Sequence, residues 1–206
     1  MNSKDNLVNW AMKLQSLAQA GLTYGKDKFD LERYQEIRTI SAEMMSWKSD
    51  MPLKKVKSLF CNEIGYQTPK IATRAAIFKN QKILLVQEND GTWSIPGGWC
   101  EVNLSVKENC IKEVKEEAGI DIEVKKVIAL HSLSKHSSKE YPYGVLEIFF
   151  LCKPKEGHFE QNIETIDSKY FGINELPNMS SDKGSKEQAL MCFKALNDPL
   201  WIAQFE

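Results

Sequence analysis

The sequence has little that would mark a membrane-spanning, secreted or nucleic-acid-binding protein. No apolar run reaches the roughly 18 residues that a membrane-spanning helix needs. The opening MNSKDNLVNWAMKLQ lacks the apolar core of a signal peptide. The formal net charge is only −1, so the chain offers no basic surface for long nucleic acids. We therefore expect a cytoplasmic protein with no membrane partner, and the charge argues against a long nucleic acid as a partner while leaving short RNA ends open.

Patterned cysteine is also missing. The five cysteines are scattered through 206 residues, and no CxxC pair occurs among them. An odd, unpatterned set is typical of reduced thiols, and it argues against a disulfide framework or a zinc site. The remaining composition, 42% hydrophobic and 27% charged, is that of an ordinary globular protein. The length allows one full domain with a small appendage.

The first third of the chain has the periodicity of helices. Trp10, Leu14 and Leu17 recur at i, i+4 and i+7, which places them on one helix face. Two further apolar segments with helical spacing follow before the glycine and proline residues near position 65. We interpret these stripes as packing surface of a small helical N-terminal domain over residues 1–66.

Beyond this region the pattern changes to strands interleaved with helices. The first two strand segments are separated by a short turn around Asn80, which indicates a hairpin. The expected strands are 71–78, 82–87, 124–130, 145–152 and 169–171, and the expected helices are 104–118 and 186–197. Alternation of this kind predicts an α/β sandwich with a mixed sheet, which we expect over residues 67–206.

One expected helix carries a concentration of carboxylates. Ser105 opens it with a capping-box pattern, and Gly119 fits a left-handed cap at its end. Glu113, Glu116 and Glu117 lie at i, i+3 and i+4, so they can share one face. Like charges at this spacing destabilise a helix by roughly 0.2–0.5 kcal/mol per pair, and a bound cation would reverse that sign. Carboxylate ligands suit Mg²⁺ or Mn²⁺; a solvated face neutralised by lysines is the alternative.

The segment from residue 94 to residue 120, SIPGGWCEVNLSVKENCIKEVKEEAGI, resembles the Nudix box, G-x5-E-x7-R-E-U-x-E-E-x-G-U with U aliphatic. The match begins at Gly98 and covers 23 residues. The resemblance implies a Nudix-type α/β/α sandwich with a mixed sheet, preceded by the helical domain. It also implies Mg²⁺ or Mn²⁺ bound by Gly98, Glu113, Glu116 and Glu117.

Two positions depart from the box. Leu104 stands where the box has its first Glu, and Lys112 stands where it has Arg. In the family that Arg orients the neighbouring ligand Glu, and a Lys keeps the charge but loses the planar fork. These departures bear on the rate and on the number of metal ions. The three glutamates most associated with metal binding are all retained.

A helical N-terminal module followed by a PGGW entry is similar to a bacterial Nudix subgroup acting on nucleoside diphosphates linked to another moiety. Its members are described as ADP-ribose or CDP-choline pyrophosphatases. The resemblance implies a hydrolase in which water attacks one phosphorus of the diphosphate. Glu116, Glu117 or Glu164 would take the proton. We expect a homodimer in which the helical module supplies the dimer contact or part of the substrate pocket. We favour CDP-choline as the substrate.

Five residues outside the helix are candidates for substrate binding. Arg74, in an otherwise apolar strand, could direct its guanidinium at a phosphate or pair with a carboxylate on the strand face. His136, in a polar loop, could hold a substrate group. Trp99 and Tyr143, together with Tyr141, could form aromatic walls for the quaternary ammonium of CDP-choline. Ordinary packing is the alternative for these three rings.

Two other classes of function remain open from the sequence. One is a Nudix-like domain that senses a nucleotide without turnover, for which Leu104 is the main argument. The other is an RNA-processing hydrolase, because phosphodiester chemistry can use the same metal. Metal-dependent phosphate release from small dinucleotides tests the first, and salt-dependent cleavage of RNA tests the second.

Overall fold

The computed structural model of the chain describes residues 3–137 and 141–206. Within them the chain divides into two compact units. The first comprises residues 3–69 and 141–144, and the second comprises residues 70–137 and 145–206. None of the described helices combines the length and the apolarity of a membrane span.

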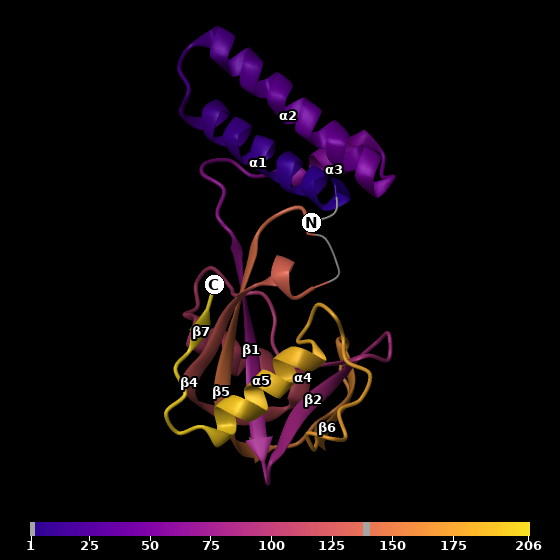
Figure 1. The fold of residues 1–206 in the computed structure, drawn as a ribbon, viewed down its shortest axis with the longest axis vertical. Helices are drawn as coiled ribbons and strands as arrows, with labels where there is room; N and C mark the ends of the chain where they lie inside the picture. Colours follow the sequence, from indigo (N-terminus) through magenta and orange to yellow (C-terminus); the bar gives the residue numbers. More distant parts are fainter. Residues whose placement is uncertain (1–2, 138–140) are drawn as a thin grey trace. The chain divides into compact units, whose positions relative to one another are not determined.

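Residues 3–69 form three helices (Figure 1). They are α1 (Ser3–Tyr24), α2 (Lys28–Ser49) and α3 (Leu53–Phe60). Helices α1 and α2 pack through small side chains, because Ala11, Ala18 and Ala42 are fully buried and small residues let two helices approach closely. Val56 and Phe60 of α3 complete this small core.

The face of α1 that packs inside the unit is not the one with the largest apolar side chains. Trp10 and Leu17, two members of the predicted stripe, are 55% and 57% exposed. The smaller Val8 and Ala11 are buried instead. The bulky residues Trp10 and Leu17 of the predicted stripe therefore lie on the exposed side of α1 and not in the core of the unit.

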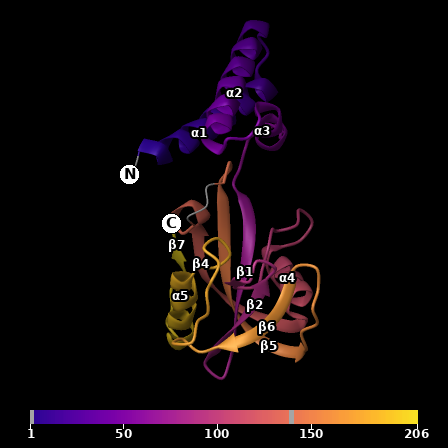
Figure 2. The ribbon, with the colours of Figure 1, turned by 90° about the vertical axis from the view of Figure 1, so that its right-hand side faces the viewer.

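A seven-stranded mixed sheet runs through residues 70–137 and 145–206 (Figure 2). Its strands are β1 (Lys70–Lys79), β2 (Lys82–Glu88), β3 (Trp93–Ser94), β4 (Ile120–Ser132), β5 (Val145–Gly157), β6 (Thr165–Phe171) and β7 (Gln204–Phe205). The strand order is β3-β2-β1-β5-β4-β7, and β6 pairs with β2. Strand β1 is parallel to β5 and antiparallel to β2.

One helix covers each face of this sheet. Helix α4 (Val106–Ala118) packs Cys110 and Val114 against alternate residues of β1 and β2. Helix α5 (Lys186–Asn197) packs against the other face, where Phe149 of β5 is fully buried. This α/β/α sandwich with a mixed sheet, preceded by helices, confirms the predicted fold class.

The local signals that set the ends of these elements are present in the structure. Asn80 and Gln81 both have positive φ values, 51° and 59°, as a two-residue hairpin turn of type I′ requires. Ser105 caps α4 in a complete capping box, and Gly119 ends it with φ 69°. Strand β7 was not predicted from the sequence, because two residues are too few to show a strand period.

Candidate functional site

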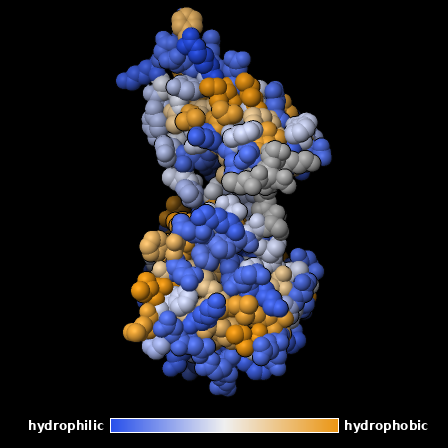
Figure 3. Space-filling model, viewed as in Figure 1, coloured by the Kyte–Doolittle hydropathy of each residue, from blue (hydrophilic) through white to orange (hydrophobic). Residues whose placement is uncertain are grey.

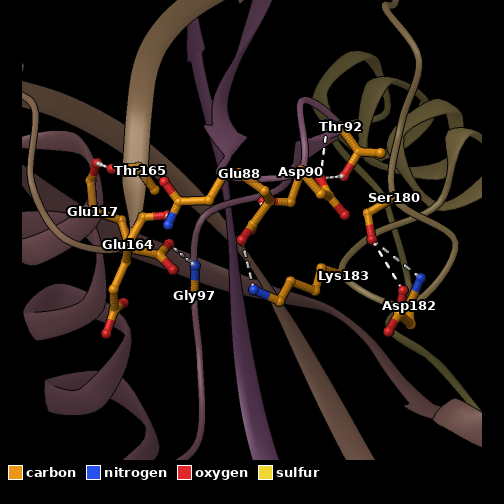
Figure 4. A network of polar contacts seen from close by, with 12 residues as sticks. Glu88, Asp90, Thr92, Gly97, Glu117, Glu164, Thr165, Ser180, Asp182 and Lys183 are labelled. Atoms are coloured by element: carbon orange, nitrogen blue, oxygen red, sulfur yellow. Dashed lines mark hydrogen bonds and ion pairs between the residues drawn. The ribbon is translucent and has the colours of Figure 1, made fainter.

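Helix α4 and the loop before it bring Glu117 and Gly97 together. Glu117 is only 6% exposed, and its Oε2 accepts a 2.7 Å hydrogen bond from the N–H of Gly97 (Figure 4). Glu113, one turn earlier, is partly buried, whereas Glu116 is exposed. The three predicted ligands therefore lie on one half of α4 but differ in their contact with solvent.

Burial of these carboxylates changes their acidity. Desolvation raises the pKa of Glu117 to about 7, against the opposing effects of the Gly97 N–H and of Arg74. The charges of Glu88 and Glu113 add to the rise. Desolvation also raises the pKa of Glu113, which the ammonium of Lys112 opposes. Carboxylates that are costly to ionise in the free protein are favourable places for a cation.

The glycine loop lies directly against the helix. A side chain at Gly97, where φ is 140°, would place its Cβ 2.0 Å from the carbonyl oxygen of Thr73. A Cβ at Gly98 would lie 2.2 Å from Oε2 of Glu113. Gly98 is thus next to a predicted ligand, and its carbonyl oxygen accepts a hydrogen bond from the N–H of Thr73. A side chain at position 98 would therefore displace the carboxylate of Glu113 from its place beside the loop.

The substituted box position, Lys112, contacts more than its predicted neighbour. Its Nζ lies 3.4 Å from Glu113 and 2.5 Å from Glu116, and a third carboxylate, Glu101, is 3.3 Å away. The hydrogen bond to Glu116 raises the pKa of Lys112, so the ammonium stays charged. The sequence analysis did not single out Glu101, although that residue lies inside the box.

Glu164 directly precedes β6, and the first residue of β6 contacts the C-terminal end of α4. The hydroxyl of Thr165 donates a 2.7 Å hydrogen bond to the carbonyl oxygen of Glu117 (Figure 4). The charge of Glu164 contributes to the raised pKa of Glu113. The structure therefore brings the carboxylate predicted from the later segment into the neighbourhood of the helix glutamates.

Arg74 is buried and pairs with Glu147 across the sheet. Its Nε donates to Oε1 of Glu147 at 2.9 Å, and its Nη1 donates to the carbonyl oxygen of Gly97 at 2.5 Å. This is the carboxylate pairing that the sequence left open as the alternative. The guanidinium holds the loop that presents Gly97 to Glu117, and a phosphate contact for Arg74 remains a prediction.

His136 is not brought to the glutamates. Its ring stacks on that of His131, with centroids 4.0 Å apart, and its Nε2 lies 2.6 Å from Oε1 of Glu206. Burial lowers the pKa of His131, and His136 adds to that effect. The ligand atoms of these three side chains lie within 4.8 Å of one another. Lys135 also pairs with Glu206, at 2.9 Å, so both Lys135 and His136 contact the residue that follows β7.

The predicted aromatic walls lie in different units. Trp99 is 47% exposed and forms an isolated antiparallel bridge with Ala72 of β1. Tyr143 belongs to the short segment that groups with the helices, and its ring is 6.1 Å from that of Tyr141. The substrate-binding roles of Trp99, Tyr143 and His136 remain predictions.

Glu88, at the end of β2, is a further carboxylate that the sequence analysis missed. Its Oε1 accepts from the hydroxyl of Ser94 at 2.6 Å, and its Oε2 lies 2.7 Å from Nζ of Lys183 (Figure 4). The negative charge of Glu88 raises the pKa of Glu117. The sequence offered one sign of this role: Glu88 ends an apolar strand segment that precedes the glycine loop.

Known protein families match both units of the chain. Residues 5–60 match a family described as "UDP-X-like, N-terminal oligomerisation domain", and residues 68–190 match the NUDIX domain. The Bacillus subtilis protein YjhB, whose name provisionally assigns ADP-ribose pyrophosphatase activity, is 40% identical over 190 residues, covering 92% of this chain and 91% of YjhB.

Two solved structures extend these matches. An ADP-ribose pyrophosphatase from Streptococcus suis is 46% identical, with a TM-score of 0.63, and the match covers 68% of this chain and 100% of that one. A UDP-X diphosphatase is 30% identical, also with a TM-score of 0.63, and covers 98% of both chains.

Proposed function

Because the chain belongs to the Nudix family and is a Nudix hydrolase, we propose that it cleaves the diphosphate bond of a nucleoside diphosphate linked to another moiety. The products would be a nucleoside monophosphate and the phosphorylated second moiety. The observation that carries this proposal is the buried carboxylate of Glu117, which faces the glycine loop and has its pKa raised to about 7.

The residues at this site fit a hard divalent cation. All the donors are oxygens, as Mg²⁺ and Mn²⁺ prefer, and burial makes two of the carboxylates costly to ionise without a cation. We propose that Glu113, Glu116 and Glu117, with the carbonyl oxygen of Gly98, hold the metal. When bound, such an ion screens the charge of the diphosphate and acidifies water.

The chain itself contributes orientation and a proton acceptor. The Gly97 N–H fixes one oxygen of Glu117, and Arg74 fixes the Gly97 carbonyl from the other side. Glu164 is near the helix glutamates and is not a member of the box, so we propose it as the general base that accepts the proton of the attacking water. Glu116 and Glu117 are the other candidates for that proton.

The names of the relatives support ADP-ribose as the first substrate to test. The Streptococcus suis structure and a Methanocaldococcus jannaschii protein, 30% identical over 122 residues, 57% of this chain and 70% of that protein, are both named ADP-ribose pyrophosphatases. CDP-choline, which the sequence analysis favoured, is the second candidate. A CDP-choline site needs aromatic faces for the quaternary ammonium, and Trp99, 47% exposed, is the aromatic candidate in the same unit as the glutamates.

We further propose that the helical unit joins two copies of the chain. Its matching family is described as an oligomerisation domain. Trp10 and Leu17 leave bulky apolar surface exposed on α1, and apolar surface gathers on the visible face of this unit (Figure 3). Contiguous apolar surface is typical of an interface. We place the boundary between the helical and hydrolase domains after residue 66.

The test of the proposed function is a substrate panel at one fixed Mg²⁺ concentration. It compares kcat/KM for ADP-ribose, a UDP-sugar and CDP-choline, with the two phosphorylated products identified in each case. Metal-dependent cleavage between the phosphorus atoms supports the proposal, and the ranking names the substrate. A tenfold difference in kcat/KM, about 1.4 kcal/mol, is enough to identify the preferred substrate. Absence of turnover with every diphosphate would favour a sensing domain.

A further inference from the structure

Lys112 lies between three carboxylates, and one of them has no role in the site proposed above. Its Nζ is 2.5 Å from Oε2 of Glu116, 3.4 Å from Oε1 of Glu113 and 3.3 Å from Oε1 of Glu101. Glu113 and Glu116 are proposed metal ligands. An ammonium and a divalent cation therefore compete for the same oxygens, whereas the third carboxylate, Glu101, is not one of the proposed ligands.

The backbone of Glu101 is held in place by α4. Its N–H donates a 3.1 Å hydrogen bond to Oδ1 of Asn109, and its carbonyl oxygen accepts from the N–H of Leu104 at 3.1 Å. Asn109 is fully buried and donates through Nδ2 to Oγ1 of Thr73. A fixed turn thus presents Glu101 beside the ammonium, three positions before the leucine that replaces the first glutamate of the box.

We propose that Glu101 is a positioning residue that holds Lys112 when Glu113 and Glu116 take up the metal. This inference rests on the metal-dependent pyrophosphatase function proposed above. Lys112 is about one third exposed, so a shift of its flexible side chain from Glu116 towards Glu101 needs no backbone movement. The shift removes the competing charge from the ligands and keeps the ammonium paired.

This arrangement predicts coupling between the two residues. In Glu101→Gln the ammonium has no alternative carboxylate, so it stays on Glu116 and Mn²⁺ binds about two- to fivefold more weakly, the range expected for an exposed ion pair. In Lys112→Met there is no ammonium to hold. Adding Glu101→Gln to Lys112→Met should then leave the Mn²⁺ affinity unchanged, which is the signature of an interaction between the two side chains.

The experiment is a titration of the full chain with Mn²⁺, in which the free ion is followed by electron paramagnetic resonance. It compares the wild type, the two single variants and the double variant, with Lys112→Gln as a second replacement should Lys112→Met fold poorly. Glu123→Gln is the matched control, because Glu123 is 48% exposed against 46% for Glu101 and is also paired with a lysine, Lys125. The control should bind Mn²⁺ like the wild type and so exclude a general effect of net charge.

Two results would overturn the inference and leave the proposed function standing. One is wild-type Mn²⁺ affinity in Glu101→Gln. The other is an equal loss from Glu101→Gln with and without Lys112, which would mean that Glu101 touches the metal itself. A wild-type chain that bound no Mn²⁺ would overturn both the inference and the metal site. Hydrolysis of ADP-ribose by the wild type, measured in parallel, separates these cases.

Discussion

The N–H of Gly97 donates a 2.7 Å hydrogen bond to the carboxylate of Glu117, and this contact joins the glycine loop to helix α4. The carbonyl oxygen of Gly97 accepts a hydrogen bond from Arg74, so the backbone N–H and the backbone carbonyl of Gly97 both form hydrogen bonds to side chains. The orientation of the most buried glutamate of the site thus depends on the backbone of one glycine, which no side chain could replace.

The first prediction concerns that glycine. Gly97→Ala would place a methyl group 2.0 Å from the carbonyl oxygen of Thr73, at a φ of 140°, so the loop must move away from Glu117. We expect kcat/KM to fall by at least tenfold, measured with the preferred substrate. Gly91→Ala is the control, because Gly91 also has a positive φ but open space around its Cβ position. Equal activity of the two variants would contradict the positioning role of the loop.

The second prediction separates the two roles considered for Arg74. Arg74→Met leaves Glu147 buried without its partner, which should destabilise the fold by about 3–5 kcal/mol in urea unfolding. The exposed pair of Arg33 with Asp30 provides the control, since Arg33→Met should cost less than about 1 kcal/mol. A raised KM with unchanged stability in Arg74→Met would instead indicate that the guanidinium binds substrate.

The third prediction follows from the pKa of Glu117, which burial raises from 4.5 to about 7. The folded chain then binds a proton that the unfolded chain has released between these pH values, so this group makes stability fall as the pH rises from about 4.5 to about 7. The loss should reach about 3 kcal/mol at most. The free energy of unfolding in urea, with EDTA present, is measured at pH 5 and pH 8 for the wild type and for Glu117→Gln. The loss due to Glu117 is the difference between the pH-dependent changes of the two proteins. Parallel pH profiles for the two proteins would show that the carboxylate is not desolvated.

The fourth prediction concerns the helical unit. Leu17→Glu puts a charge on the exposed apolar face of α1, so it should convert the proposed dimer into a monomer in light scattering after size-exclusion chromatography. Leu200→Glu is the control, because Leu200 is 86% exposed in the second unit and should leave the dimer intact. A monomeric wild type, or a dimer in Leu17→Glu, would count against this interface.

The sequence was sufficient to predict the parts of the fold that local signals determine. The capping box at Ser105, the left-handed cap at Gly119 and the hairpin turn at Asn80 each depend on a few neighbouring residues. The spacing of Glu113, Glu116 and Glu117 was likewise enough to predict a shared helix half. The spacing alone did not decide between a metal site and a solvated face. The metal-binding and hydrolytic roles came from the resemblance to the Nudix box.

What the sequence could not show depends on contacts between distant segments. Glu117 is buried because the Gly97 loop folds over it. The guanidinium of Arg74 is occupied because Glu147, on the neighbouring strand β5, accepts its hydrogen bond. The two partners are 20 positions apart in the first pair and 73 in the second, and no periodic pattern in the sequence relates positions so far apart. The outward position of Trp10 also escaped prediction, since apolar periodicity identifies a face without saying what covers it.

The proposal that the glutamates of α4 support metal-dependent cleavage of a diphosphate can be examined by hydrolysis of ADP-ribose in ¹⁸O-labelled water at saturating Mg²⁺. We expect one ¹⁸O atom in one of the two monophosphate products of the wild type. We also expect turnover in Glu117→Gln to be lower by roughly a hundredfold to ten-thousandfold, about 3–5 kcal/mol of transition-state stabilisation. The exposed Glu123→Gln should match the wild type. Near-wild-type turnover in Glu117→Gln, or turnover of the wild type that persists in EDTA, would contradict it.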